Sequence, residues 1–270
     1  MAGRLEGKVA IVTGAGRGIG RGEALALSEE GAAVVVNDLG GSTGGEGADQ
    51  TPAEEVVNEI KKNGGKAVAN YADVSNYDAC EAMVKQALDE FGRLDILVNN
   101  AGIQYVAPIE EFPTDKWNAI LAINLSAAFH TSAAAVPGMR DNGWGRIVNI
   151  ASAHGLRASP HKAAYVAAKH GIVGLTKVVA VELAGKGVTC NAVCPGFVHT
   201  PLVEKQIEDR MKETGFDRDK TIRDVILEKQ PSKQFATVEQ IAASVAFLAS
   251  DDAAQITGTT LSIDGGWTAQ

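Results

Sequence analysis

The stretch KVAIVTGAGRGIG, residues 8–20, decides the fold. Its first six residues form a short apolar, β-branched run, which predicts a buried strand, and the amphipathic pattern RGEALALSEEGA follows the glycines directly. Gly14 and Gly16 permit a tight turn, Gly18 lets a pyrophosphate approach the backbone, and Gly20 allows close packing of the helix. The N-terminus of that helix then faces the phosphates. Strand, glycine-rich turn and helix in this order predict a dinucleotide-binding site.

The rest of the chain repeats the alternation of strand and helix. Further strands are expected at residues 32–38, 66–74, 94–102, 145–152, 188–196 and 259–266. Helices are expected between them, at residues 51–65, 77–92, 114–140, 159–186 and 237–250. Apolar runs between helices indicate strands that are buried on both faces. The sequence therefore predicts an α/β fold, a doubly wound (Rossmann) parallel sheet of about seven strands with helices on both faces.

Composition limits the remaining possibilities. The 270 residues, 45% of them apolar, predict one compact domain spanning residues 1–270. A formal net charge of −8 without any block of Lys and Arg argues against a nucleic-acid partner. Three irregularly spaced cysteines predict reduced, buried thiols, with neither a disulfide framework nor a metal site. With no leader pattern and no apolar run of membrane-spanning length, we expect a cytoplasmic protein without a membrane partner.

Two segments interrupt the regular pattern. Residues 39–51 form a glycine-rich loop, which we interpret as a tolerated surface insertion. Residues of about 199–235 carry apolar side chains at helical spacing and follow the strand at 188–196. This segment is expected to form a small helical lid over the carboxyl ends of the strands, where a substrate binds.

Asp38 ends the second expected strand and favours NAD as the cofactor. A carboxylate at that position accepts hydrogen bonds from the adenosine ribose and repels the 2′-phosphate of NADP. Arg17 in the glycine turn instead favours NADP, because a guanidinium can pair with the 2′-phosphate. We give Asp38 the greater weight, since one flexible surface arginine offsets little of that repulsion.

Six motifs occur together in a characteristic order: TGAGRGIG from Thr13, NNAG from Asn99, Asn124, Ser152, YVAAK from Tyr165, and the pair Pro195-Gly196. This set resembles the short-chain dehydrogenase/reductase family over essentially the whole chain. The resemblance implies a homotetramer and a catalytic set of Asn124, Ser152, Tyr165 and Lys169. It also implies cofactor contacts from Thr13, Gly14, Arg17, Gly18, Ile19, Gly20, Asp38, Asp73, Val74, Asn100, Ala101, Gly102, Tyr165, Lys169, Pro195, Gly196, Val198 and Thr200.

The expected reaction is hydride transfer from a secondary alcohol to nicotinamide, which needs a base for the hydroxyl proton. Tyr165 is the candidate base, and Lys169, one helical turn further on, favours its phenolate and binds the nicotinamide ribose. Ser152 is expected to hydrogen-bond the reacting oxygen, and Asn124 to support a water relay from Lys169 to solvent.

The second half is most similar to family members that oxidise (R)-3-hydroxybutyrate, a small carboxylate, to acetoacetate. In those members the carboxylate is held by residues that correspond here to Gln104, His154, Lys162 and Gln206, and Ser152 and Tyr165 also contact the substrate. By its spacing from Tyr165, Lys162 is expected on a neighbouring part of the same helical face. Phe197 stands where those enzymes have tryptophan, while Trp267 is kept, so the pocket for the methyl group is expected to be wider.

The sequence leaves two alternatives to this interpretation. The stretch VVVNDLGG resembles peroxisomal hydroxyacyl-CoA enzymes, which favours a longer 3-hydroxy acid or a 3-hydroxyacyl thioester as substrate. A neutral thioester has no use for a paired lysine and histidine, which argues against it. A dinucleotide sensor without activity is disfavoured by the intact Ser152, Tyr165 and Lys169. His161, His170 and Arg157 have no assigned role.

Overall fold

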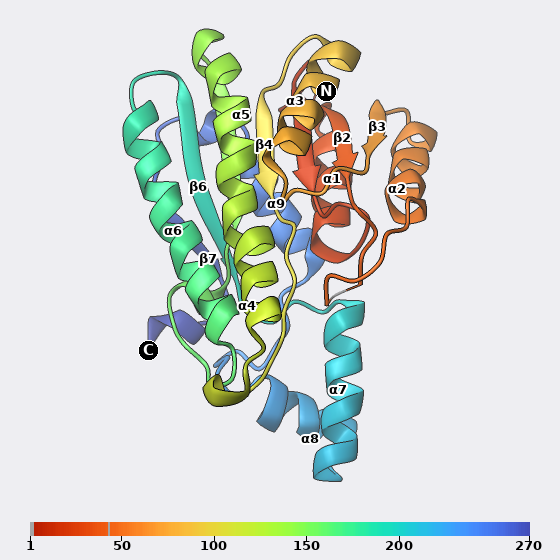
Figure 1. Ribbon diagram of the computed structural model, residues 1–270, viewed down its shortest axis with the longest axis vertical. Coiled ribbons are helices and arrows are strands. Elements are labelled where there is room, and N and C mark those ends of the chain that lie inside the picture. The colour runs from red at the N-terminus through yellow and green to blue at the C-terminus, as the bar shows by residue number, and fades with distance from the viewer. Residues whose placement is uncertain (1–2, 43) are drawn as a thin grey trace.

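One parallel sheet of seven strands forms the centre of the computed structural model, which describes residues 3–42 and 44–270, without the side chains of residues 201 and 202 (Figure 1). The strand order is β3-β2-β1-β4-β5-β6-β7. The strands are β1 (Val9–Thr13), β2 (Ala33–Asn37), β3 (Ala67–Asn70), β4 (Ile96–Asn99), β5 (Gly145–Ile150), β6 (Val188–Pro195) and β7 (Thr260–Ile263). β1, β4, β5 and β6 are buried along their whole length, as expected for inner parallel strands. The predicted fold class is confirmed.

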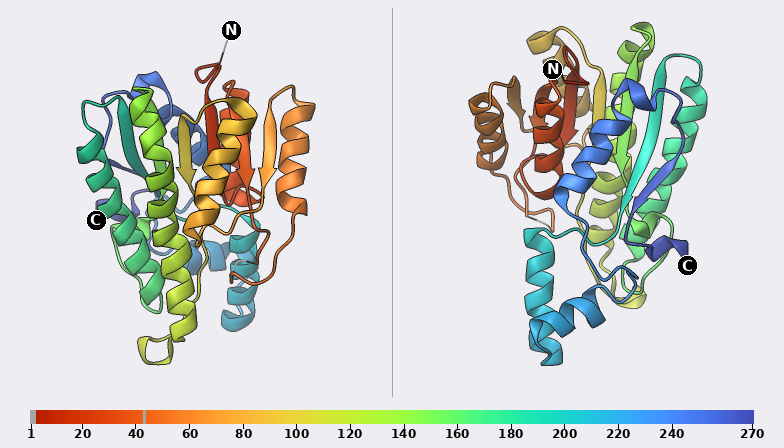
Figure 2. Two further views of the ribbon diagram at one scale, coloured as in Figure 1. Left: turned by 45° about the horizontal axis from the view of Figure 1, so that its top comes forward. Right: turned by 180° about the vertical axis from the view of Figure 1, so that it is seen from behind.

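Helices cover both faces of the sheet (Figure 2). One face carries α1 (Gly18–Glu29), α2 (Thr51–Lys62) and α9 (Val238–Leu248), and the other carries α3 (Tyr77–Phe91), α5 (Ala127–Asp141) and α6 (Ala163–Leu183). Each layer has its own apolar core. The three cysteines are buried free thiols within or beside these cores, as predicted. The short helices η1 (Ile109–Glu111) and η5 (Asp251–Ala253) lie in connecting loops.

The helix expected at 114–140 contains a π-helical turn. It runs as α4 (Thr114–Leu121), the π-turn η2 (Ala122–Ser126) and α5. Asn124 is buried within η2, and its side chain accepts from the Ile103 amide at 2.8 Å and donates to the Ile103 carbonyl at 2.9 Å. Turns of this type disturb the helix ladder and are frequent at functional sites.

The helix expected at 159–186 begins later than predicted. α6 starts at Ala163, and Lys162 is its N-cap residue rather than part of its first turn. Ser159 precedes Pro160, which disfavours helical backbone at Ser159, and His161 has a left-handed φ of 65°. The assignment of Lys162 to the helical face of Tyr165 was therefore wrong.

Two helical segments, Thr114–Asp141 and Ala163–Leu183, are long and apolar enough to span a membrane by length and composition. The expectation that no segment reaches this length was therefore wrong. Both segments nevertheless bury part of their surface against the sheet, through residues such as Thr131, Ala135 and Ile172. Core helices of compact α/β domains have the same length and composition, so these two carry little weight as membrane spans.

The excursion after β6 is helical, as expected. It comprises α7 (Pro201–Thr214), α8 (Arg218–Lys220) and the π-helical turn η4 (Thr221–Ile226). Thr200 caps α7, and the buried side chains of Val203, Ile207, Ile226 and Leu227 form a small core of their own. These helices project from the carboxyl edge of the sheet (Figures 1 and 2). This is the position in which a lid was expected.

Candidate active site

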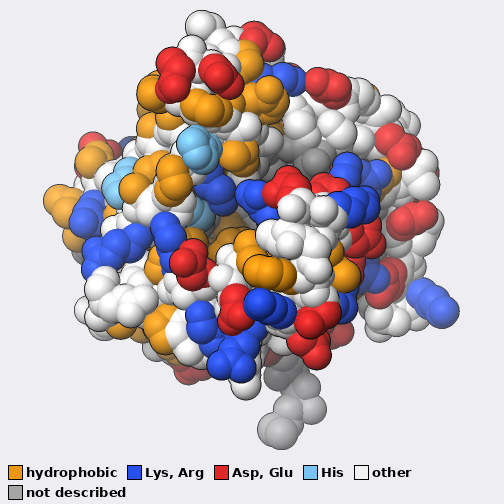
Figure 3. All heavy atoms as spheres, turned by 90° about the horizontal axis from the view of Figure 1, so that it is seen from below, with side chains coloured by type: hydrophobic (Ala, Val, Ile, Leu, Met, Phe, Trp, Pro, Cys, Tyr) orange, Lys and Arg blue, Asp and Glu red, His pale blue; other side chains and the backbone are white. Residues whose placement is uncertain are grey.

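A cavity of about 470 Å³ opens at the carboxyl edge of the sheet. It lies where the strand order reverses between β1 and β4, the place where open parallel sheets bind ligands. The surface at this end of the molecule presents several Lys and Arg side chains beside hydrophobic ones and histidines (Figure 3). Nearly all of the predicted cofactor residues line the cavity: Gly14, Arg17, Gly18, Ile19, Gly20, Asp38, Asp73, Val74, Asn100, Ala101, Gly102, Tyr165, Lys169, Pro195, Gly196, Val198 and Thr200.

The glycine turn leaves room for a bound group. Gly14 has a φ of +63°, and a Cβ there would lie 2.8 Å from the Cα of Ala101. Gly18, with a φ of +54°, faces open space, because the nearest atom to a Cβ there would be a Thr200 methyl at 3.8 Å. The turn therefore offers exposed backbone at the start of α1, which fits a pyrophosphate.

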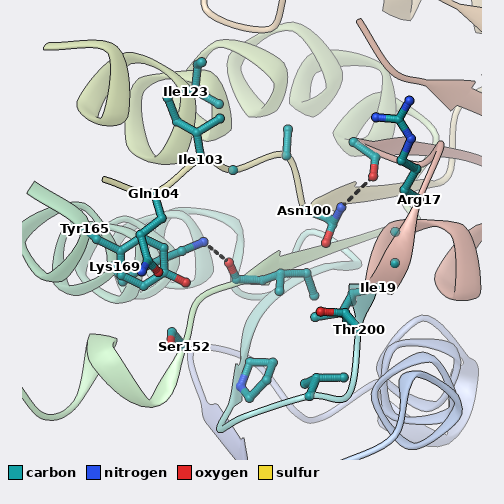
Figure 4. Close-up of a pocket in the computed structure, with 18 of the residues that line it drawn as sticks. Arg17, Ile19, Asn100, Ile103, Gln104, Ile123, Ser152, Tyr165, Lys169 and Thr200 are labelled. Atoms are coloured by element: carbon teal, nitrogen blue, oxygen red, sulfur yellow. Dashed lines mark hydrogen bonds between the residues drawn. The ribbon is translucent and has the colours of Figure 1, made fainter. Parts of the chain in front are cut away.

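Thr13 and Asn124 differ from the other predicted site residues, because neither lines the cavity. The Thr13 hydroxyl accepts from the amides of Asn100 and Ala101 at 3.0 and 3.1 Å. The Asn100 side chain donates back to the carbonyls of Thr13 and Gly14 (Figure 4). Thr13 thus joins the glycine turn to the NNAG turn, while Asn124 holds the backbone at Ile103.

Asp38 is held by two backbone amides. Its carboxylate accepts from Gly16 at 2.7 Å through Oδ2 and from Gly40 at 2.7 Å through Oδ1. Each oxygen retains a further lone pair, and Asp38 lines the cavity. The side chain is therefore fixed in place and still able to accept hydrogen bonds from a ligand.

The glycine-rich loop forms part of the cavity wall, which the interpretation as a surface insertion missed. Leu39, Gly41, Ser42 and Gly45 line the cavity; Thr43 lies outside the described residues. The loop is closed by the Asp49 amide, which donates to the Leu39 carbonyl at 3.0 Å.

Two further contacts dock this loop on the rest of the domain. Glu46 forms an ion pair of 2.8 Å with Lys116 of α4. A Cβ at Gly45 would lie 3.0 Å from the Cδ1 atom of Ile103, so the loop backbone passes close to the segment after β4. The loop therefore covers one side of the cofactor end of the cavity.

Ser152, Tyr165 and Lys169 converge on the other end of the cavity (Figure 4). Ser152 follows β5 and caps η3 (Ala153–Gly155), while Tyr165 and Lys169 extend from the first turns of α6. The ammonium of Lys169 donates to the Ile150 carbonyl at 2.6 Å and lies 5.6 Å from the centre of the Tyr165 ring. The carboxyl end of β5 thus anchors Lys169 beside the tyrosine.

Burial controls the proton affinities of these groups. It raises the pKa of Tyr165, and the neighbouring Ser152 hydroxyl partly offsets that rise. Burial also lowers the pKa of Lys169 to about 8, against the opposing influence of Cys194 and Glu23. Burial therefore disfavours the phenolate form of Tyr165, and an additional positive charge in the cavity would favour it.

The predicted substrate residues surround the same end. Gln104, His154, Lys162, Phe197, Gln206 and Trp267 all line the cavity with Ser152 and Tyr165. Among the described residues, Lys162 has no acidic partner within 4 Å. Its pKa is lowered by burial and by the charges of Lys229 and Arg210. A half-buried lysine without a counter-ion suits an anionic ligand.

Aromatic rings close the substrate end. Phe197 and Trp267 are stacked, with ring centres 5.7 Å apart, and Trp267, in η6 (Trp267–Ala269), meets the edge of the His154 ring at 5.0 Å. Burial, followed by the charges of Lys162 and Lys229, lowers the pKa of His154 to about 3. The imidazole is therefore neutral at physiological pH and can donate only one hydrogen bond.

Several lining residues were not identified from the sequence. Ile103, Ile123 and Val203 add apolar surface, and the loop 39–45 adds backbone. Nothing in their side chains distinguishes them from core residues, so only the fold identifies them. The described residues contain no cluster of three His, Cys, Asp or Glu that would hold a metal ion.

The chain belongs to the short-chain dehydrogenase/reductase family. The family model described as enoyl-(acyl carrier protein) reductase matches residues 14–268, which include the whole glycine turn and the catalytic segment. The expected membership is confirmed.

Individual relatives match over nearly the full length. The chain is 51% identical over 263 residues to a D-beta-hydroxybutyrate dehydrogenase of Rhizobium meliloti, covering 97% of this chain and 99% of the relative. It is also 51% identical over 268 residues to a D-beta-hydroxybutyrate dehydrogenase of Cupriavidus necator, covering 98% and 100%. A 3-oxoacyl-[acyl-carrier-protein] reductase of Synechocystis is 41% identical over 263 residues, covering 97% of each chain.

Proposed function

We propose that this protein is an NAD-dependent dehydrogenase that interconverts (R)-3-hydroxybutyrate and acetoacetate. The observation that carries the proposal is the placement of Lys162 in the same cavity as Ser152 and Tyr165, with no acidic partner among the residues that the structure describes. A small 3-hydroxy acid needs both a cation for its carboxylate and a base for its hydroxyl. The 51% identity to two D-beta-hydroxybutyrate dehydrogenases supports the same substrate.

Each residue of the site has a role in this reaction. Tyr165 accepts the substrate hydroxyl proton, and Ser152 donates a hydrogen bond to the reacting oxygen. Lys169, whose ammonium donates to the Ile150 carbonyl, binds the nicotinamide ribose. Its charge favours the phenolate together with the positive charge that bound nicotinamide would add. Bound NAD supplies C4 of nicotinamide as the hydride acceptor. Gln104, His154, Lys162 and Gln206 hold the carboxylate, while Phe197 and Trp267 enclose the methyl group.

The preference for NAD over NADP rests on Asp38. Its carboxylate is fixed by the Gly16 and Gly40 amides and lines the cavity. A ribose with two free hydroxyls donates to such a carboxylate, whereas a 2′-phosphate is repelled by it. Arg17 lies 3.9 Å from Asp49, so part of its charge is already matched within the protein.

A spectrophotometric panel tests the substrate and the cofactor together. NAD and NADP are each combined with D- and L-3-hydroxybutyrate, the five-carbon homologue and a 3-hydroxybutyryl thioester, and reduction is followed by absorbance. We expect the highest kcat/KM for NAD with D-3-hydroxybutyrate and no turnover of the L isomer. Faster turnover of the thioester would instead favour the alternative substrate, a 3-hydroxyacyl thioester, that the VVVNDLGG stretch suggests.

Tyr165→Phe tests the catalytic assignment. Loss of the phenolic oxygen removes the base and is expected to lower kcat by about 10²- to 10⁴-fold, a typical contribution of general acid–base catalysis. NAD affinity, measured by calorimetry, should stay within a factor of about two, because the ring remains. Wild-type turnover in this variant would show that another group is the base.

The apolar outer faces of α5 and α6 support a homotetramer. Phe129, Val178 and Val181 are 55%, 54% and 77% exposed on these two helices, although they are large and hydrophobic. Such a surface is buried more favourably against a second copy than against water. We expect light scattering to give a mass of four chains without detergent, and cell fractionation to place the protein in the cytoplasm.

A further inference from the structure

A chain of polar contacts runs from the catalytic serine to the surface through two residues that have no role in the mechanism above. Ser152 Oγ lies 3.4 Å from Nδ1 of His154, and Nε2 of His154 lies 3.0 Å from the hydroxyl of Ser159. The ammonium of Lys229 donates to the same hydroxyl at 3.2 Å. Ser159 precedes α6 and Lys229 follows η4, so two distant segments of the chain meet at His154.

Which group donates in each of these hydrogen bonds follows from the protons that Lys229, Ser159 and His154 carry. A lysine ammonium only donates, so the Ser159 oxygen accepts from Lys229. The Ser159 proton then needs an acceptor, and among the described residues Nε2 of His154 lies within hydrogen-bonding distance. His154 is neutral, so if Nε2 accepts, Nδ1 must carry the ring proton.

We propose that Ser159, oriented by Lys229, donates to Nε2 of His154 and thereby fixes the ring proton on Nδ1, facing Ser152. Ser159 and Lys229 are then positioning residues for the active site. The ring is buried and has edge contacts with Tyr165 at 5.8 Å and with Trp267 at 5.0 Å, so it is held in this orientation. The consequence for catalysis rests on the proposed function.

The tautomer decides what Ser152 can do. Ser152 Oγ already accepts from the His154 backbone amide at 3.1 Å. With a proton on Nδ1, the ring cannot take the Ser152 hydroxyl proton, which stays available to the reacting oxygen beside Tyr165. With Nδ1 unprotonated, the ring would compete for that proton. The 3.4 Å contact is also long for a hydrogen bond, so Nδ1–H remains available to a substrate oxygen.

The test measures the tautomer directly, without substrate. Protein labelled with ¹⁵N-histidine is examined by long-range ¹⁵N–¹H correlation NMR, and His154→Gln assigns the His154 signals among the five histidines. We expect a protonated Nδ1 and an unprotonated Nε2 in the wild type. Ser159→Ala should shift the ring toward the other tautomer, and Ser159→Thr, which keeps the hydroxyl, should restore the wild-type pattern.

Lys229→Met should change the His154 signals in the same direction as Ser159→Ala, though less, whereas Lys205→Met, an exposed lysine of α7, should leave them unchanged. A protonated Nε2 in the wild type, or identical signals in Ser159→Ala, would overturn the inference. Thermal unfolding of each variant verifies that it is folded.

Kinetics separate this inference from the proposed function. If both hold, Ser159→Ala lowers kcat/KM for D-3-hydroxybutyrate by about tenfold, the value of one hydrogen bond near 1.4 kcal/mol, and leaves NAD affinity unchanged. Absence of turnover in the wild type with the expected NMR signals would reject the function alone. Normal turnover in Ser159→Ala with unchanged signals would reject the inference alone.

Discussion

At the scale of single residues, the proposed contact of Lys162 with the substrate carboxylate can be tested by substitution. It occupies the N-cap position of α6 without a capping hydrogen bond, lines the cavity beside His154, and lacks an acidic partner among the described residues. Lys162→Met should raise KM for 3-hydroxybutyrate by about 10- to 100-fold, since a hydrogen bond to a charged group contributes about 1.5–3 kcal/mol. KM for NAD should hardly change. Lys177→Met, on the exposed side of the same helix, is the matched control, and an equal effect in both variants would refute the carboxylate role.

For single residues, the sequence predicted which side chains line the cavity better than it predicted their positions within the helices and loops. Ser152, Tyr165 and Lys169 lie together as expected, because strand ends and helical spacing constrain them. Lys162 lines the cavity, but from the position before the first helical residue, since Ser159-Pro160 delays the start of the helix. Ser159 and Lys229 were not identified, because their relation to His154 depends on two loops meeting in space.

At the scale of elements, the largest difference from the sequence-based prediction is the loop after β2, which lines the cavity. Glycine-rich composition indicates flexibility, yet this loop is docked through Glu46 and Gly45 against α4 and Ile103. Composition alone does not specify such contacts, which depend on the shape of the neighbouring surface.

Gly45 and Gly47 provide a matched pair for testing the loop. Both have a positive φ, +82° and +84°, so alanine strains the backbone equally at either position. A Cβ at Gly45 would press on Ile103, whereas one at Gly47 would meet nothing within 4 Å. Gly45→Ala should weaken NAD binding several-fold by calorimetry, and Gly47→Ala much less. Equal affinities in the two variants would argue against the loop as part of the cofactor site.

For the whole molecule, the predicted architecture is confirmed: all seven expected strands join one parallel sheet, although the helix expected at 159–186 begins later. The burial of Glu23 was not predicted. A glutamate in an amphipathic helix pattern is expected on the exposed side, and here its carboxylate is buried. Among the described residues, neither of its oxygens has a hydrogen-bond partner, and burial raises its pKa to about 8, with Lys169 opposing the rise. Part of the stability of the fold therefore depends on this proton.

Glu23→Gln tests that dependence. The folded-state pKa of about 8 lies above the ordinary value of 4.5, so wild-type stability falls as the pH rises through this interval. Glutamine has no proton to lose, and the variant should gain on the order of 3–4 kcal/mol relative to wild type between pH 5 and pH 8. Urea unfolding at fixed protein concentration measures this, with the exposed Glu29→Gln as control. A difference that does not vary with pH would contradict the assignment.

The double attachment of Asp38 has a consequence for redesigning coenzyme use. One carboxylate fastens the glycine turn through Gly16 and the loop after β2 through Gly40. Replacing Asp38 with a small neutral residue to admit NADP would also remove the hydrogen bonds that hold the Gly16 and Gly40 amides. A change of the proposed NAD preference therefore calls for a replacement loop that supplies its own hydrogen bonds to the glycine turn, rather than a point substitution at Asp38.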